Sequence, residues 1–354
     1  MQATPVLPKP FKHCALSLRA LAAGAIITSL ISTVNGHALA QSREVRVYSG
    51  RHYSSDNAIY ERFTKATGIK VRLLESNDAA IIERLRREGK NSSADVMILV
   101  DAAKLDNATR EGMFQPIRSA ELMRDVPLAL RDPQGRWFGL TRRVRALAIN
   151  PSVVNPKTIN TYADLAKPQF KGKLCLRNRS SVYNQSLVGD QMVLRGDAAT
   201  TQWIKGMVSN LAEPVFSSDM SLARTVARGE CGIGVVNSYY VARMLSGQSG
   251  AADKALANKI TIKYPNPAHV NVSGAGVTRF AKNKAEAIQL IEYLSSPTGG
   301  EGYASGSFEY PLKGFGNNPI LRRFGNFKFD GVTASQLGAK TRQAIQLMAA
   351  NGWE

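Results

Sequence analysis

Apolar positions along the first third of the chain alternate between two periods. Runs at residues 44–48, 69–74 and 95–100 are typical of strands, and the last is apolar almost throughout, as in a strand buried on both faces. Between them, residues 55–67 and 79–88 place apolar side chains at helical spacing and each is followed by a glycine. This alternation of strand and helix predicts parallel strands joined by helical crossovers.

The second half of the chain repeats the pattern. Two longer extended segments, 137–149 and 270–277, predict a two-strand hinge between halves. The remaining expected elements are strands at 173–176 and 232–236 and helices at 184–194, 201–210, 222–228, 284–294 and 334–348. We therefore expect two α/β lobes, the first formed by residues 41–142, the second by 143–272, with 273–354 returning to the first lobe and ending in a helix that packs across both.

The first 40 residues have the composition of an export signal. Lys9, Lys12 and Arg19 precede an apolar run at 20–34, which ends in a small-residue cleavage site, Ala38-Leu39-Ala40. No later stretch approaches the roughly 20 apolar residues that a membrane-spanning helix needs. We predict a cleaved signal peptide and a soluble protein in the periplasm; an uncleaved anchor is the alternative.

Composition and charge exclude some classes of protein. A chain of 354 residues, 44% of them hydrophobic, is long enough for two domains. Its net charge of +19 falls to +16 once the three basic residues of the signal are removed. These charges are scattered along amphipathic segments without a nucleic-acid-binding motif, so we expect no nucleic-acid partner. The positive field favours anionic partners or a docking surface. We also expect the protein to be a monomer.

Two cysteines remain after the predicted cleavage, Cys175 and Cys231, each in a short apolar run. An exported protein can form a disulfide between them, but two buried free thiols in neighbouring strands would give the same pattern. The sequence leaves both readings open. It contains no Cys-x-x-Cys motif or Cys/His cluster that would indicate zinc.

Four tyrosines occupy predicted junctions between a strand and a helix: Tyr53, Tyr183, Tyr239 and Tyr240. In an open α/β sheet, ligands bind outside the carboxyl ends of the strands, so these junctions can meet in one interlobe cleft. Phenolate oxygen suits a hard, highly charged cation such as Fe³⁺, and such a cation favours ionisation of the phenols at neutral pH. Binding would then release protons and weaken as the pH falls.

Packing is the competing explanation for each of these residues, because a lone tyrosine is usually a partly buried aromatic. The adjacent pair is different, since neighbouring side chains at a strand end point in different directions. His52 is close enough along the chain to reach the same site, although whether it is a ligand stays open. Arg51 and Arg243 are candidates to balance the negative charge of the phenolates. His269 and the other tyrosines are interpreted as structural.

Four segments resemble those of the periplasmic ferric iron-binding proteins, and most closely the cyanobacterial FutA type. They are 48–53, 181–186, 237–243 and 269–274, and the similarity extends over essentially the whole mature chain. The resemblance implies a type II periplasmic-binding-protein fold, with two doubly wound α/β lobes joined by a two-strand hinge and closing on Fe³⁺. It also implies delivery to the permease and ATPase of an ABC importer.

Matched residue by residue, the resemblance assigns phenolate ligands to Tyr53, Tyr183, Tyr239 and Tyr240. His52 matches a histidine that is a ligand in some members only, and Arg243 matches an arginine beside the metal. Some relatives add a synergistic anion and a carboxylate ligand. No carboxylate here occupies a matching position, so we expect an all-phenolate site without an obligatory anion. A preference for Fe³⁺ over Fe²⁺ is not determined by the sequence.

Two other functions explain the sequence less well. A periplasmic binder of a small anion or organic solute would use helix N-termini, a bidentate arginine and hydroxyls such as those of Ser54, Ser55, Ser180 and Ser181, but it leaves the four phenols unexplained. An enzyme would need a nucleophile with a positioned base, and the chain has no Gly-x-Ser-x-Gly, His-Glu-x-x-His or P-loop motif. We therefore do not expect an enzyme.

Overall fold

The structure is a computed structural model that describes residues 43–354. The predicted signal peptide, residues 1–40, lies outside the described residues. Within them, no helix combines the length and the apolar character needed to cross a membrane.

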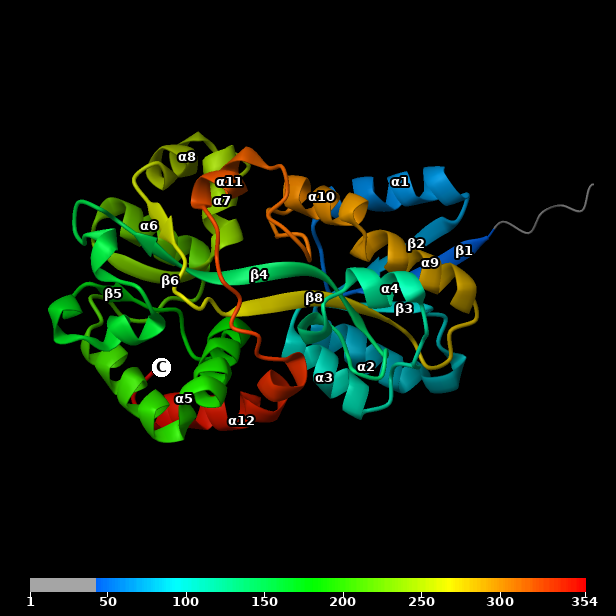
Figure 1. Ribbon diagram of the computed structural model, residues 1–354, viewed down its shortest axis with the longest axis horizontal. Coiled ribbons are helices and arrows are strands. Elements are labelled where there is room, and N and C mark those ends of the chain that lie inside the picture. The colour runs from blue at the N-terminus through cyan, green and yellow to red at the C-terminus, as the bar shows by residue number, and fades with distance from the viewer. Residues whose placement is uncertain (1–42) are drawn as a thin grey trace, which may run out of the picture. The chain divides into compact units, whose positions relative to one another are not determined.

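The strands of the described residues form one eight-stranded sheet, in which seven follow the order β2-β1-β3-β8-β4-β6-β5 and β7 pairs with β4. Their bounds are β1 (Glu44–Ser49), β2 (Lys70–Glu75), β3 (Val96–Leu99), β4 (Phe138–Ile149), β5 (Leu174–Cys175), β6 (Ile233–Asn237), β7 (Thr261–Lys263) and β8 (Val270–Val277). We call the part built on β1, β2 and β3 lobe 1, and the part built on β5, β6 and β7 lobe 2. The long strands β4 and β8 lie side by side and connect the two (Figure 1).

Parallel pairing, as predicted, is found within each lobe: β1 pairs in parallel with β2 and β3, and β5 with β6. The centre of the sheet differs. There β8 is antiparallel to both β3 and β4, and β4 is antiparallel to β6. The reason is that β4 and β8 pass from one lobe to the other instead of returning through a helical crossover within one lobe.

The helices cover the faces of this sheet (Figure 1). The α-helices are α1 (Asn57–Thr67), α2 (Asp78–Glu88), α3 (Ala102–Arg110), α4 (Ala120–Asp125), α5 (Val182–Ser209), α6 (Asp219–Arg228), α7 (Ser238–Ser246), α8 (Ala251–Ala257), α9 (Lys284–Ser295), α10 (Pro297–Gly306), α11 (Pro319–Phe324) and α12 (Ala334–Ala350). The 3₁₀ helices are η1 (Ser54–Asp56), η2 (Gly89–Asn91), η3 (Leu128–Leu130), η4 (Pro156–Thr158), η5 (Tyr162–Ala166) and η6 (Pro168–Phe170).

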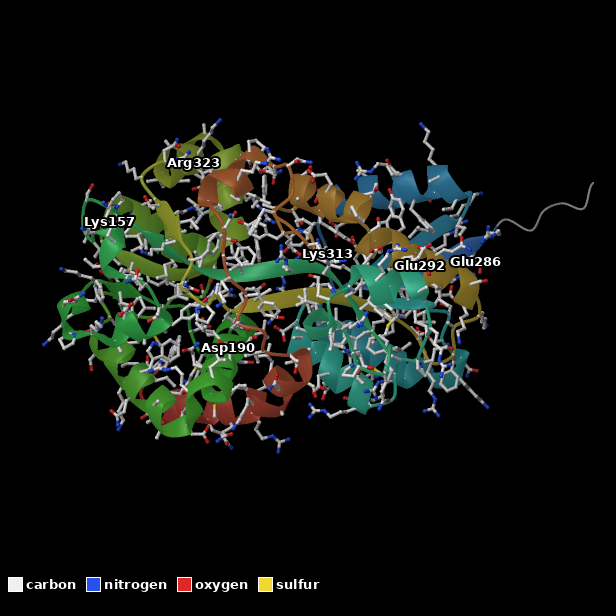
Figure 2. The ribbon with its side chains drawn as sticks, in the orientation of Figure 1. Lys157, Asp190, Glu286, Glu292, Lys313 and Arg323 are labelled. Atoms are coloured by element: carbon white, nitrogen blue, oxygen red, sulfur yellow. A yellow bond between two sulfur atoms is a disulfide. The ribbon has the colours of Figure 1, made fainter. Side chains whose placement is uncertain are left out.

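Most predicted helices are present, and glycine and proline residues set several of their ends. The two helices expected at 184–194 and 201–210 form α5, which is interrupted at Gly196, where φ is 78° and the backbone leaves the helical region. Asp190, before this break, is fully buried (Figure 2). Pro297 not only stops α9 but also begins α10, a position where its missing N–H costs nothing.

The two lobes have separate hydrophobic cores, and different parts of the long strand β4 belong to each. Phe138 and Leu140 of β4 belong to the core of lobe 1, whereas Val144 of the same strand belongs to a core of lobe 2. The C-terminal helix α12 packs against both α3 and α5. The predicted lobe boundaries stay a prediction.

Cys175 and Cys231 form a disulfide, with their Cα atoms 6.0 Å apart. The first lies at the end of β5 and the second just before β6, so the bond joins the two parallel strands that precede α5 and α7. The structure thus decides the alternative that the sequence left open.

Candidate functional site

Tyr53 stands at the end of β1, on the lobe 1 side of the site. It is the N-cap residue of η1, with an extended backbone and a half-buried side chain. Two guanidinium groups lie near its ring: the central carbon of Arg51 is 5.0 Å and that of Arg243 5.2 Å from the ring centre. Arg243 belongs to α7 in lobe 2, so this contact crosses between the lobes. His52 is exposed, and its ring stacks on that of Tyr53 at 5.7 Å.

The other three tyrosines come from lobe 2, in the first turns of two helices. Tyr183 begins α5, and Tyr239 and Tyr240 begin α7 directly after β6. The Tyr239 hydroxyl donates to the Tyr183 hydroxyl at 3.2 Å, and the rings of Tyr239 and Tyr240 lie 4.4 Å apart. The N-terminal end of a helix carries partial positive charge, which stabilises a phenolate relative to a phenol.

Three arginines that sequence reasoning missed surround the Tyr183 ring. The guanidinium carbons of Arg143, Arg145 and Arg177 lie 5.5, 5.8 and 5.4 Å from its centre. Arg145 is paired with Asp219 at 2.6 Å, and Arg177 lies 3.7 Å from the same carboxylate. The sequence contained a signal for Arg143 and Arg145, because charged residues are unusual inside a mostly apolar strand such as β4.

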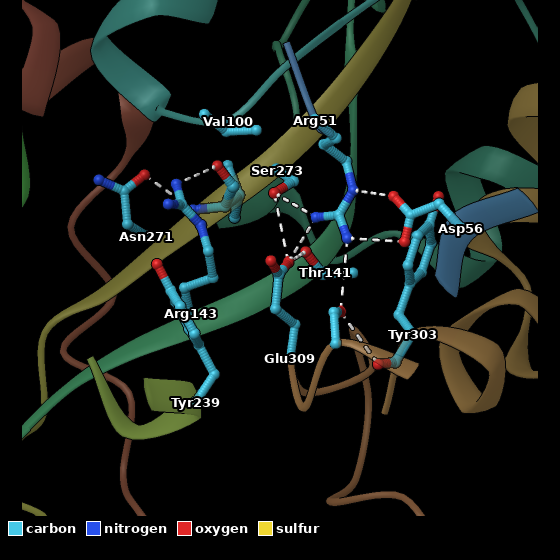
Figure 3. Close-up of polar contacts among 12 residues, drawn as sticks. Arg51, Asp56, Val100, Thr141, Arg143, Tyr239, Asn271, Ser273, Tyr303 and Glu309 are labelled. Carbon is cyan, nitrogen blue, oxygen red and sulfur yellow. Dashed lines mark hydrogen bonds and ion pairs between the residues drawn. The ribbon is translucent and has the colours of Figure 1, made fainter. Parts of the chain in front are cut away.

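Of these three arginines, Arg143 is the one that forms no ion pair among residues 43–354. It is buried and donates one hydrogen bond, to the carbonyl of Val272 at 3.1 Å, and its Nε has no partner within the described part of the chain (Figure 3). Burying an arginine charge without a carboxylate in contact is costly. Phenolates of Tyr183 and Tyr239, which both lie within electrostatic range of it, would compensate that charge.

Arg51 is committed to a buried ion-pair network (Figure 3). It bonds to Asp56 and to Glu309, each at 2.7 Å, and to the Ser273 hydroxyl at 2.9 Å. Glu309 also accepts a hydrogen bond from the Thr141 hydroxyl. Burial alone would raise the pKa of Glu309, but Arg51 and Arg143 lower it, so this carboxylate is ionised and already bonded. Whether the site lacks a carboxylate ligand stays a prediction.

The tyrosines are close enough to change one another's ionisation. Burial raises the pKa of Tyr53 above its usual value, and Glu309 and Tyr183 raise it further, while Arg51 and Arg143 oppose the rise. Burial and the three neighbouring phenols raise the pKa of Tyr239 well above 10, and burial also raises that of Tyr240. The phenols of Tyr53, Tyr239 and Tyr240 are therefore protonated at neutral pH when no cation is present. A bound trivalent cation supplies the charge that ionises them.

The structure thus brings all four predicted tyrosines to one place between the lobes, with Arg51 and Arg243 both close to the ring of Tyr53. His52 is beside the group but faces solvent. Their roles as metal ligands and as balancing charges stay predictions. The donor set of four phenol oxygens, in an environment rich in arginine, can hold a small, hard, highly charged cation.

Comparison with known proteins identifies relatives over nearly the whole chain. This chain is 40% identical over 319 residues to iron uptake protein A1 of Synechocystis, and the match covers 89% of this chain and 88% of that protein. It is 37% identical to iron uptake protein A2 of the same organism, covering 94% and 96% of the two chains. With the Fe(3+)-binding periplasmic protein of Serratia marcescens it shares 28% identity, covering 92% and 96%.

Solved structures of similar proteins agree with these sequence relationships. FutA of Trichodesmium in complex with iron and citrate superposes with a TM-score of 0.84 at 40% identity, covering 88% of this chain and all of that one. Apo FutA2 of Synechocystis gives a TM-score of 0.83 at 38% identity, with coverages of 89% and 100%. The predicted resemblance and the type II periplasmic-binding-protein fold are both confirmed. Residues 58–312 match the bacterial extracellular solute-binding proteins, and the chain belongs to that family.

Proposed function

We propose that this protein captures ferric iron between its lobes through the phenolates of Tyr53, Tyr183, Tyr239 and Tyr240. The observation that carries the proposal is the convergence of four phenols from three separate strand-to-helix junctions, including the 3.2 Å contact between the hydroxyls of Tyr183 and Tyr239. Packing alone does not account for partly buried hydroxyls that contact one another beside several arginines. The iron-binding names of its relatives support the same ligand.

The charge balance supports a trivalent ion. Four phenolates on Fe³⁺ leave one net negative charge, and the arginines around Tyr53 and Tyr183 offset it. Three of the four phenols belong to lobe 2, so we infer that lobe 2 holds the ion first and that closure of the hinge adds Tyr53. His52 is placed to approach the ion from the exposed side, and we assign it a smaller contribution.

We further propose that the protein works in the periplasm after cleavage of residues 1–40 and delivers iron, as a monomer, to the permease and ATPase of an ABC importer. The description of the Serratia relative as a periplasmic protein supports this location. The proposal of binding, and not catalysis, is supported by the description of the family as extracellular solute-binding proteins.

The test is a titration of metal-free protein with ferric citrate, followed by visible absorption. Ferric phenolate absorption at one iron per chain supports the proposal, provided that Tyr240→Phe removes or strongly shifts the band. Tyr293→Phe is the matched control, because it deletes a hydroxyl from a half-buried tyrosine of α9 outside the site. Absence of colour with iron, together with thermal stabilisation by an anion or an organic solute, would overturn the proposal of iron binding and favour that other ligand.

A further inference from the structure

A second group of metal-binding side chains lies outside the tyrosine site. It consists of Asp190 on α5, His269 immediately before β8, and Asp330 in the segment before α12. The Nδ1 atom of His269 is 3.3 Å from one carboxylate oxygen, Oδ1 of Asp190, and 3.7 Å from another, Oδ2 of Asp330. The three atoms all lie within 4.8 Å of one another, and the three side chains are no more than 2% exposed.

Each of these side chains uses one polar atom for a neighbour and leaves the other free. The second oxygen of Asp190 accepts from the Gln191 amide at 2.9 Å, the second oxygen of Asp330 accepts from the Val332 N–H at 2.8 Å, and Nε2 of His269 contacts the Ser186 hydroxyl at 2.9 Å. Among the described residues, the three converging atoms have no partner with hydrogen-bond geometry. Side chains that bind a metal are oriented in this way, each held by an outer contact while its remaining atom faces the ion.

The charge of this cluster is not balanced by a lysine or an arginine. Among residues 43–354, neither Asp190 nor Asp330 forms an ion pair with a lysine or arginine; the partner of both is His269. Two buried carboxylates need a counter-charge, and a single imidazolium would supply only half of it. With a neutral imidazole, a divalent cation would balance them completely.

The distances also suit such an ion. Tetrahedral zinc, with bonds to nitrogen and oxygen of about 2.0–2.2 Å, separates its ligand atoms by about 3.4 Å. The two distances from His269 Nδ1, 3.3 and 3.7 Å, are close to that value. One imidazole and two carboxylates form a donor set that binds zinc and related transition metals.

We propose that Asp190, His269 and Asp330 form a second, structural binding site for a divalent transition-metal ion, with Zn²⁺ as its representative. The ion links α5, the start of the hinge strand β8 and the segment that leads into α12. It is independent of the proposed iron site, and it extends the interpretation of His269 as structural. The rival occupant is a proton: burial lowers the pKa of His269, but the two carboxylates outweigh this effect and raise the pKa to about 9.

The experiment is a zinc titration of the metal-free full chain carrying Tyr239→Phe and Tyr240→Phe, which weakens competing binding at the tyrosines. We expect one tightly bound zinc per chain by mass spectrometry of the metal content. Asp330→Asn or Asp190→Asn lowers the affinity at least a hundredfold, and Ser186→Ala lowers it about 10–100-fold by removing the outer contact of His269. Asp197→Asn is the matched control on α5, since its side chain is 47% exposed, and it leaves zinc binding unchanged.

Nitrogen NMR of the histidines decides between metal and proton without relying on the variants. The signals of His269 are assigned by their absence in His269→Gln. Zinc should shift the Nδ1 signal of His269 while its Nε2 remains protonated. An imidazolium signal at neutral pH that zinc does not change overturns the proposal, as does undiminished zinc binding in Asp330→Asn. Ferric phenolate colour, measured in chains with all four tyrosines, should persist in Asp330→Asn, which separates this site from the proposed iron site.

Discussion

Replacing Arg143 by glutamine tests whether a buried cation stabilises the ionised tyrosines. Arg143 is 3% exposed, and its guanidinium carbon lies 5.5 Å from the centre of the Tyr183 ring. Glutamine removes the charge but keeps an amide that can donate a hydrogen bond to the Val272 carbonyl, which Arg143 bonds at present. The substitution therefore changes mainly the electrostatic energy of the site.

The expected magnitude follows from Coulomb's law. Binding of Fe³⁺ to four phenols, with loss of four protons, converts a neutral site into one with a single negative charge. Two unit charges separated by 5.5 Å interact by about 3 kcal/mol at an effective dielectric constant of about 20. Loss of that interaction corresponds to about two orders of magnitude in iron affinity at a fixed pH.

Competition with citrate, followed through the phenolate absorption band, measures this loss. Arg143→Lys keeps the charge and should recover most of the affinity. Arg177→Gln is the matched control, because its guanidinium carbon is 5.4 Å from the same ring but its side chain is 20% exposed and faces Asp219. Solvent screening should limit its effect to less than about tenfold. An equal loss in both glutamine variants, or an unchanged affinity in Arg143→Gln, would refute the reasoning.

Three further predictions concern the ligands, the pH dependence and the disulfide. Tyr239→Phe or Tyr240→Phe should weaken iron binding more than His52→Ala, because the tyrosines are at least partly buried and adjoin the other phenols whereas the histidine is exposed; citrate competition would expose an equal or reversed order. Because the raised pKa values keep Tyr53, Tyr239 and Tyr240 protonated without iron, each phenolate that iron forms from them should lower the affinity about tenfold per unit fall in pH, and an unbuffered titration that released no protons would contradict this. Replacing Cys175 and Cys231 together by alanine should lower the free energy of unfolding by about 4 kcal/mol for a sequence separation of 56 residues, a prediction that an unchanged urea midpoint would disprove.

The sequence alone predicted many of the local elements and singled out the four tyrosines, although it missed helices such as α3 and α8. Strand and helix periods are properties of neighbouring residues, so segments such as β8 and α9 were predicted to within about one residue at each end. Tyr53, Tyr183 and the adjacent pair were recognised because each follows a strand and begins a helix, and parallel strands direct such positions to one edge of the sheet.

Only the tertiary structure decided which distant side chains share an environment. It paired Cys175 with Cys231, made β4 and β8 antiparallel to their neighbours, and brought Arg143 beside Tyr183. It also revealed the buried cluster at His269, whose two aspartates lie far from it in sequence. These relations depend on how the lobes pack and on how burial strengthens charge interactions, and no local pattern along the chain encodes either of them.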